Sequence, residues 1–206
     1  VYKRQSFDIP VFMDHKKSIL LNSFVEYVRS LLGMIQENFT YESVFRYLRS
    51  GYCEFTEDEI DRLENYCLAL GIKGYKKWQQ AWARKTKEAD EEEVEKLNHL
   101  RVKFVEKIDP LMFVSRQKKK TVLDITLAVY EFIAGEHLQE KLEQQQKFFA
   151  EQGELTLAKE YEQIYRIVME LFDKFSELLG DEPITLKEYC ELLDAGFEEA
   201  KVGVIP

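Results

Sequence analysis

Two helical patterns follow one another in TYESVFRYLRSG (residues 40–51) and TEDEIDRLENYCLALG (residues 56–71). In the first, apolar residues recur at intervals of three and four, which places them on one face of a helix. Thr40 stands where an N-cap is needed. In the second, Thr56 and Glu59 have the spacing of a capping box, and a glycine closes each run. This part of the chain is therefore predicted to form two amphipathic helices.

The same signals recur along the rest of the chain. Only four prolines and nine glycines occur in 206 residues, which favours long helices over a sheet-rich fold. Short apolar runs at the two ends, Ile9–Met13 and Val202–Pro206, are typical of strands. We therefore predict an all-α fold with a short strand at each end. The other helices are expected over residues 22–35, 90–109, 122–134, 137–152, 155–179 and 185–200.

Two of these helices carry specific expectations. The helix that begins in the acidic run at residue 90 should end at Asp109-Pro110, because proline disfavours a helical conformation in the residue before it. The helix over residues 122–134 is apolar nearly all round, which predicts a buried central helix. Its buried side chains should include Ile125, Val129 and Phe132.

The helix over residues 155–179 is expected to be the longest, and it carries an uninterrupted a/d seam. Such a seam can pair with a second chain as a coiled coil or pack inside a domain. Tyr165 and Phe172 widen the apolar stripe, which favours packing inside a helical domain. The seam consists of Leu157, Tyr161, Ile164, Val168, Leu171, Phe175 and Leu178.

Composition and charge limit the classes of protein. The formal net charge of −9 argues against a dedicated nucleic-acid-binding domain but leaves room for a local basic patch. Three widely spaced cysteines, Cys53, Cys67 and Cys190, favour a reducing, cytoplasmic compartment over a disulfide framework. No apolar run is long enough to span a membrane. Because Val1 stands where an initiator methionine would be, we expect a segment of a longer chain.

Several blocks of sequence resemble the B subunit (AddB) of the AddAB helicase–nuclease family, the bacterial relatives of RecBCD. They occur in order along nearly the whole chain, and the acidic segment around residues 88–95 is the least distinctive. Such blocks indicate a lineage and do not by themselves indicate a chemistry. The blocks are VFRYLRSG (44–51), DEIDRLENYCLALGIKGYKKW (58–78), LRVKFVEKIDPL (100–111) and ITLKEYCELLDAGFEEAKVGVIP (184–206).

The resemblance implies a helical domain inserted into the second motor core of a UvrD-type helicase fold. Residues 1–21 and 201–206 would then belong to the core, and residues 22–200 would form the helical domain. The parent would process double-strand DNA breaks for homologous recombination together with its A subunit. Its cofactors would be ATP, Mg²⁺ and a 4Fe–4S cluster, all bound outside this fragment. A cytoplasmic location without membrane contact is expected.

The residues of this chain do not match common catalytic or metal-binding patterns. No GxxxxGK[ST] run is present to hold a nucleotide. No glutamate stands three residues before His15, His99 or His137, as a di-iron bundle requires. The cysteines lack the C-x₂-C-type spacing of zinc and iron–sulfur sites. We therefore expect no catalytic, cofactor-binding or metal-binding residue in this fragment.

One group of residues has a functional interpretation. Residues 72–87 hold six basic residues and no acid, interleaved with aromatic residues, and a second basic run follows at residues 116–120. Lysine and arginine attract phosphates, and aromatic rings can stack on bases. Alternatively, Trp78 and Trp82 pack in the core and the lysines form a solvated face. A second hypothesis is a helical protein–protein interaction domain without DNA contact, built around the seam from Leu157 to Leu178. The candidate DNA-binding residues are Lys73, Lys76, Lys77, Trp78, Arg84, Lys85, Arg116, Lys118, Lys119 and Lys120.

Overall fold

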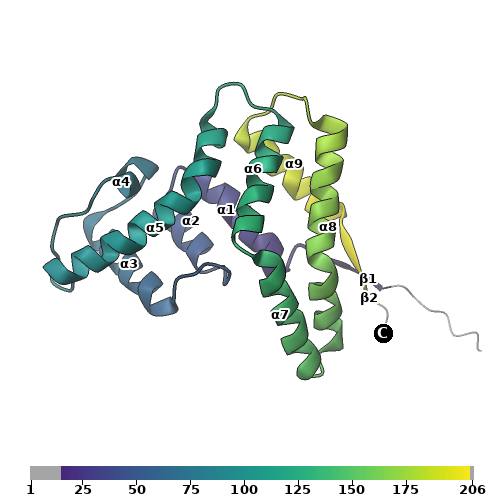
Figure 1. Ribbon diagram of the computed structural model, residues 1–206, viewed down its shortest axis with the longest axis horizontal. Helices are drawn as coiled ribbons and strands as arrows, with labels where there is room; N and C mark the ends of the chain where they lie inside the picture. Colours follow the sequence, from purple (N-terminus) through teal and green to yellow (C-terminus); the bar gives the residue numbers. More distant parts are fainter. Residues whose placement is uncertain (1–14, 205–206) are drawn as a thin grey trace, which may run out of the picture.

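The computed structural model describes residues 15–204 as nine helices and one pair of short strands (Figure 1). Helices α2 to α5 form one side of the molecule, α6 to α9 form the other, and α1 lies between them. The predicted all-α fold with strands at its ends is confirmed. The elements are β1 (His15–Ser18), α1 (Ser23–Gln36), α2 (Tyr41–Leu48), α3 (Glu57–Leu70), α4 (Tyr75–Gln79), α5 (Glu91–Arg116), α6 (Val122–Gly135), α7 (Leu138–Glu151), α8 (Leu155–Leu179), α9 (Leu186–Glu199) and β2 (Lys201–Val204).

The two ends of the described chain meet in an antiparallel strand pair, in which His15 lies opposite Val204. The buried Glu160 of α8 fixes this pair, because it accepts hydrogen bonds from Lys17 Nζ at 2.6 Å and Asn22 Nδ2 at 2.9 Å. The predicted strand near the carboxyl end is confirmed as far as residue 204. The predicted strand Ile9–Met13 lies outside the described residues.

Side-chain capping fixes the starts of most of the helices. Thr56 and Thr185 form complete capping boxes, in which a glutamate side chain also accepts from the threonine backbone N–H. The predicted capping boxes are therefore confirmed. The side chains that accept a hydrogen bond from a backbone N–H of the first helical turn are those of Asn22, Thr40, Thr56, Asp90, Thr121 and Thr185.

The predicted end of α5 at Pro110 is wrong, because the helix continues to Arg116. A proline inside a helix removes one backbone hydrogen bond and costs about 3 kcal/mol. Here Leu111 and Met112, directly after the proline, are buried in the core at 1% and 3% exposure. Their burial offsets the loss at Pro110, which itself lies on the exposed side. At 26 residues, α5 is also longer than α8, which has 25.

The prediction that α6 is a buried central helix is correct for only one of its faces. Ile125 and Val129 of α6 are fully buried, but Phe132 is only partly buried. Leu127 and Tyr130 are 49% and 44% exposed, so α6 is covered on one face and open on the other. Apolar residues all round a helix do not establish that neighbours cover every side.

The seam of α8 packs inside the domain, mainly against α7 and α6. Ile164, Val168 and Phe175 are buried, as predicted. Leu178 is 77% exposed because it lies in the last turn of the helix, and its assignment to a buried seam was wrong. The predicted packing within a helical domain is thus the arrangement that the structure has.

Gly74 places α4, the short helix that carries Lys76 and Lys77. Its N–H donates to the Phe39 carbonyl oxygen at 2.8 Å, which fixes the start of α4 against the turn between α1 and α2. Its backbone angles, φ 85° and ψ 137°, lie where essentially only glycine is unstrained. The sequence GIKG thus supplies a turn that directs α4 across the aromatic core.

Replacing Gly74 by alanine should therefore strain this turn. We expect Gly74→Ala to lower the free energy of unfolding by about 1–3 kcal/mol, measured by urea denaturation. The control is Gly71→Asn at the left-handed cap of α3 (φ 60°, ψ 42°), which asparagine tolerates, with a loss below about 1 kcal/mol. Equal losses in the two variants would contradict the role assigned to Gly74.

Candidate nucleic-acid interface

Polar contacts fasten α4 and the segment after it to α5. The Asn98 side chain accepts from the Trp82 backbone N–H at 2.9 Å and donates to the Trp82 carbonyl at 2.7 Å. The buried Arg101 donates to the Trp78 carbonyl oxygen at 2.7 Å. Because α4 has only five residues, these contacts with α5, together with aromatic packing, hold it in place.

Both tryptophans belong to the core. Trp78 is 1% exposed and packs edge-on against Phe104, with ring centroids 5.0 Å apart. Trp82 is 8% exposed, stacks on Tyr66 at 5.2 Å, and donates its indole N–H to the Lys77 carbonyl oxygen. A buried ring has no free face for a base, so Trp78 is removed from the set of DNA-contacting residues.

Arg116 joins the second basic run to the first. Its guanidinium carbon lies 4.6 Å from the centroid of the Tyr75 ring in α4, within cation–π distance. This contact exists only because α5 continues past Pro110. The second basic run therefore begins beside α4, the helix that carries Lys76 and Lys77.

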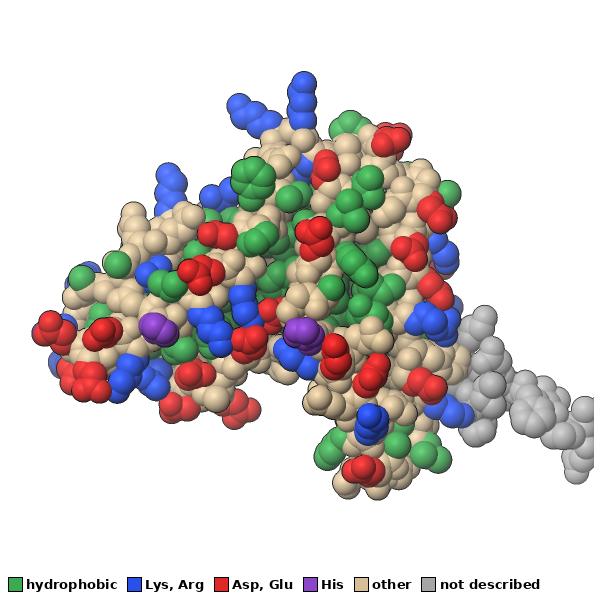
Figure 2. Space-filling view, viewed as in Figure 1, with side chains coloured by type: hydrophobic (Ala, Val, Ile, Leu, Met, Phe, Trp, Pro, Cys, Tyr) green, Lys and Arg blue, Asp and Glu red, His purple; other side chains and the backbone are tan. Residues whose placement is uncertain are grey.

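Most of the candidate cations have no acidic partner within the part of the chain that the structure describes. Two of the lysines are already engaged: Lys85 pairs with Glu91 at 2.8 Å, and Lys120 Nζ donates to the Gln117 carbonyl oxygen at 3.0 Å. The remaining cations are exposed, and we call them the basic surface: Lys73, Lys76, Lys77, Arg84, Arg116, Lys118 and Lys119. In Figure 2, Lys and Arg side chains project freely over the α5–α6 loop and along the neighbouring upper edge.

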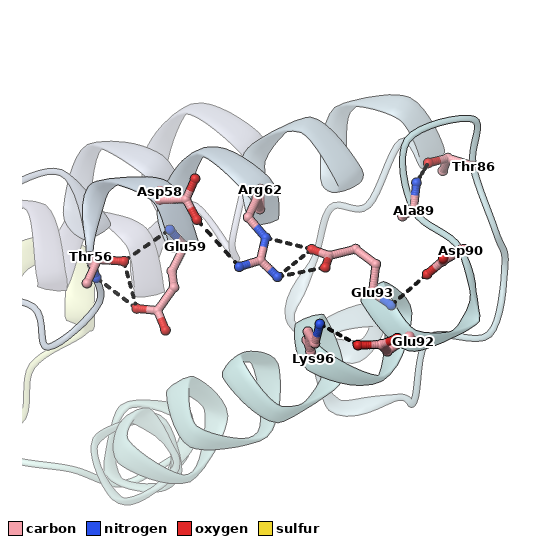
Figure 3. A network of polar contacts seen from close by, with 10 residues as sticks. All are labelled: Thr56, Asp58, Glu59, Arg62, Thr86, Ala89, Asp90, Glu92, Glu93 and Lys96. Carbon is pink, nitrogen blue, oxygen red and sulfur yellow. Dashed lines mark hydrogen bonds and ion pairs between the residues drawn. The ribbon is translucent and has the colours of Figure 1, made fainter.

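Cations elsewhere in the fold are used differently. Figure 3 shows Arg62 of α3 held by two acids, with Arg62 Nη2 2.6 Å from a Glu93 oxygen and a longer contact to Asp58. Lys96 pairs with Glu92 at 2.7 Å in the same network. An ion pair already neutralises such a cation, whereas the basic surface keeps its charge available for an anionic ligand.

Sequence reasoning missed one exposed aromatic residue beside the basic surface. Phe113 is 71% exposed and lines a groove between α4 and the end of α5 together with Tyr75 and Arg116. Its position three residues before Arg116 could have indicated a shared helical face, but Phe113 lies beyond Pro110, where the helix was predicted to end.

The cysteines do not form a metal centre. Among residues 15–204, no three His, Cys, Asp or Glu side chains are grouped as metal ligands. Burial raises the pKa of the Cys53 thiol to about 11 and those of Cys67 and Cys190 to about 12. The chain has three cysteines, one fewer than the four thiolate ligands that a 4Fe–4S cluster takes, so its residues do not by themselves fit such a cluster. None of the described helices combines the length and apolar character needed to cross a bilayer.

Comparison with known proteins gives the lineage. The chain is 45% identical over 201 residues to the B subunit of the ATP-dependent helicase/deoxyribonuclease of Lachnoclostridium phytofermentans, a match that covers 96% of this chain. The corresponding protein of Clostridium novyi is 37% identical over 97% of the chain, and that of Alkaliphilus metalliredigens 37% over 98%. Over nearly its whole length, this chain is homologous to one segment of these helicase/deoxyribonuclease B subunits. No family model matches it.

The match covers nearly all of this chain but only a small part of its relatives. It spans 18% of the Lachnoclostridium protein, 17% of the Clostridium one and 19% of the Alkaliphilus one. The lineage indicated by the sequence blocks is thereby confirmed. The activity named for these proteins is that of relatives several times longer than this chain.

The burial of the tryptophans predicts a spectroscopic result. Tryptophan emission should lie at short wavelength, resist quenching by acrylamide, and stay unchanged when duplex DNA is added, because neither indole can reach a base. Trp78→Phe and Trp82→Phe variants assign the signal to each ring. Strong quenching by DNA that disappears in the Trp78→Phe variant would show that this ring contacts DNA after all.

Proposed function

We propose that this chain is a non-catalytic helical part of the helicase-like region of an ATP-dependent helicase/exonuclease subunit, and that it guides duplex DNA along its basic surface. The observation that carries the proposal is the packing of Arg116 on Tyr75, which places the start of the second basic run beside α4, whose exposed lysines have no acidic partner among the described residues. Unpaired lysines and arginines on one surface are what the phosphates of a duplex attract.

The charge of the rest of the chain favours DNA binding at the basic surface over binding at α6 to α9. Residues 121–200 contain 19 aspartates and glutamates against six lysines and arginines, so α6 to α9 repel a polyanion. The Debye length at physiological salt is about 8 Å, so the basic surface acts on a nearby phosphate without strong interference from distant acids. A negatively charged fragment can therefore bind DNA weakly at one place and in one orientation.

The relatives' name supports a role within a larger machine. In this proposal, the parent works in the cytoplasm with an A subunit and processes double-strand DNA breaks for homologous recombination. ATP, Mg²⁺ and the 4Fe–4S cluster are assigned to other parts of the parent, and this chain supplies no residue to them. The helical domain of residues 22–200 is inserted in a motor core, to which the paired strands β1 and β2 connect it.

Charge reversal tests the proposal. The triple variant Lys76→Glu, Lys77→Glu, Lys119→Glu should bind a short duplex at low salt at least about tenfold more weakly than the natural sequence, and the slope of log K against log[salt] should fall by up to about three. Thermal stability should stay nearly unchanged, because exposed lysines contribute little to folding. Fluorescence anisotropy over a salt titration measures the affinity and the slope, and a thermal melt measures the stability.

The matched control reverses three exposed lysines on the other side, Lys147, Lys174 and Lys187. Three reversals of two charges each take both variants from −9 to −15, so net charge alone cannot separate them. If both variants lose the same affinity, DNA senses only total charge. If neither variant loses affinity, the basic residues are a solvated face and the interaction-domain function is favoured instead.

A further inference from the structure

A groove lies between α4 and the last two turns of α5. Its volume is about 450 Å³, with Tyr75 and Gln79 on the α4 side and Asp109, Phe113 and Arg116 on the α5 side. Asp109, Phe113 and Arg116 are spaced by four and three residues, so they follow one another along a single face of α5. An acid, an aromatic ring and a cation thus stand in a row, each about one helical turn from the next.

Phe113 is an exposed aromatic residue, whereas both tryptophans are buried. Its ring is 71% exposed, whereas the rings of Phe39, Trp78 and Phe104 nearby pack against each other in the core. Exposed phenylalanine gains little from hydrophobic burial in the chain alone. Beside a basic surface, a free ring provides a platform on which a base can stack, with a gain that depends little on base identity.

Arg116 is the cation at the end of this row. Its guanidinium lies over the Tyr75 ring, which limits its motion, and it has no carboxylate partner among residues 15–204. Arginine in this arrangement keeps its N–H groups free for a phosphate. Lys118 and Lys119 follow directly in the chain and extend the cationic edge.

Asp109, at the other end of the row, would orient a nucleotide bound in the groove. Asp109 repels a phosphate, so the backbone of a nucleotide is directed to the Arg116 end and its base toward Phe113. The carboxylate of Asp109 accepts hydrogen bonds, and the amide of Gln79 both donates and accepts them, which suits the polar edge of a base. In an intact duplex, neighbouring base pairs cover both faces of each base, so only an unpaired nucleotide has a face to offer.

We propose that this groove binds an unpaired nucleotide of DNA, with its base stacked on Phe113 and its phosphate paired with Arg116. The inference rests on the proposed function, which brings DNA to the basic surface, and adds a preference for DNA that is locally single-stranded. A surface that guides duplex DNA would thereby also hold one base of a strand that has been separated from its complement.

The test compares a fluorescein-labelled oligothymidylate with a duplex of the same length, using the whole chain at low salt. Phe113→Ala should weaken binding of the oligothymidylate about five- to 150-fold, the range of one lost base–aromatic stack, and leave duplex binding unchanged. Phe113→Trp should restore the affinity. Oligomers carrying 5-iodouracil should form a photocrosslink at residue 113 in the natural sequence.

The control is Phe148→Ala on α7, which removes an aromatic side chain that is 56% exposed and far from the basic surface in sequence. It should change neither affinity. The inference is overturned if Phe113→Ala leaves the affinity for oligothymidylate unchanged, or lowers both affinities equally, while charge reversal still weakens duplex binding. If the natural sequence shows no salt-dependent binding of either DNA, the proposed function itself fails.

Discussion

The contact on which one half of this fold depends is the packing of Phe104, in the middle of α5, against three other rings. Its centroid lies 5.0 Å from Trp78, 6.0 Å from Phe39 and 6.2 Å from Tyr47, and the side chain is 2% exposed. These partners come from α4, the turn between α1 and α2, and α2 itself, so one side chain connects all three to α5. Each aromatic pair contributes about 0.5–1.5 kcal/mol beyond the burial of its surface.

From Phe104 the ring contacts continue in both directions. On one side they pass through Tyr47, Tyr27, Tyr52 and Phe24, which stacks on Tyr165 of α8. On the other side they pass through the tryptophans to α3. The aromatic residues between 72 and 82 therefore serve the core, and their burial turns the neighbouring lysines outward. Within α4, Tyr75 and Trp78 face the core while Lys76 and Lys77 face outward.

Local signals allowed much of this fold to be predicted, because they depend on residues close together in sequence. N-caps such as Thr56 and Thr185 act on their own first turn, so the starts of α3 and α9 were found correctly, whereas α4, which has no side-chain cap, was not predicted. The passage of α5 through Pro110 depends on what Leu111 and Met112 contact, and no local rule contains that information. The same holds for α6, where composition could not reveal which of two apolar faces is covered.

The sequence indicated which cations belong to the candidate site, but it did not indicate which aromatic residue beside them is exposed. Runs of lysine are visible in any sequence, but the burial of Trp78 and the exposure of Phe113 are decided by the packing of α4 on α5. A tryptophan four residues from another fits both a core and a stacking platform. Only the position of the residues on the assembled helices separates these interpretations.

The central claim is that α4 and the end of α5, with the loop that follows, form one DNA-contacting surface. Hydrogen exchange with and without DNA tests it most directly, because it reports on all backbone segments at once. DNA should slow exchange together in residues 73–87 and 113–120 and leave the turn between α7 and α8 unchanged. Protection in only one of these two segments, or protection centred on the α7–α8 turn, would contradict it.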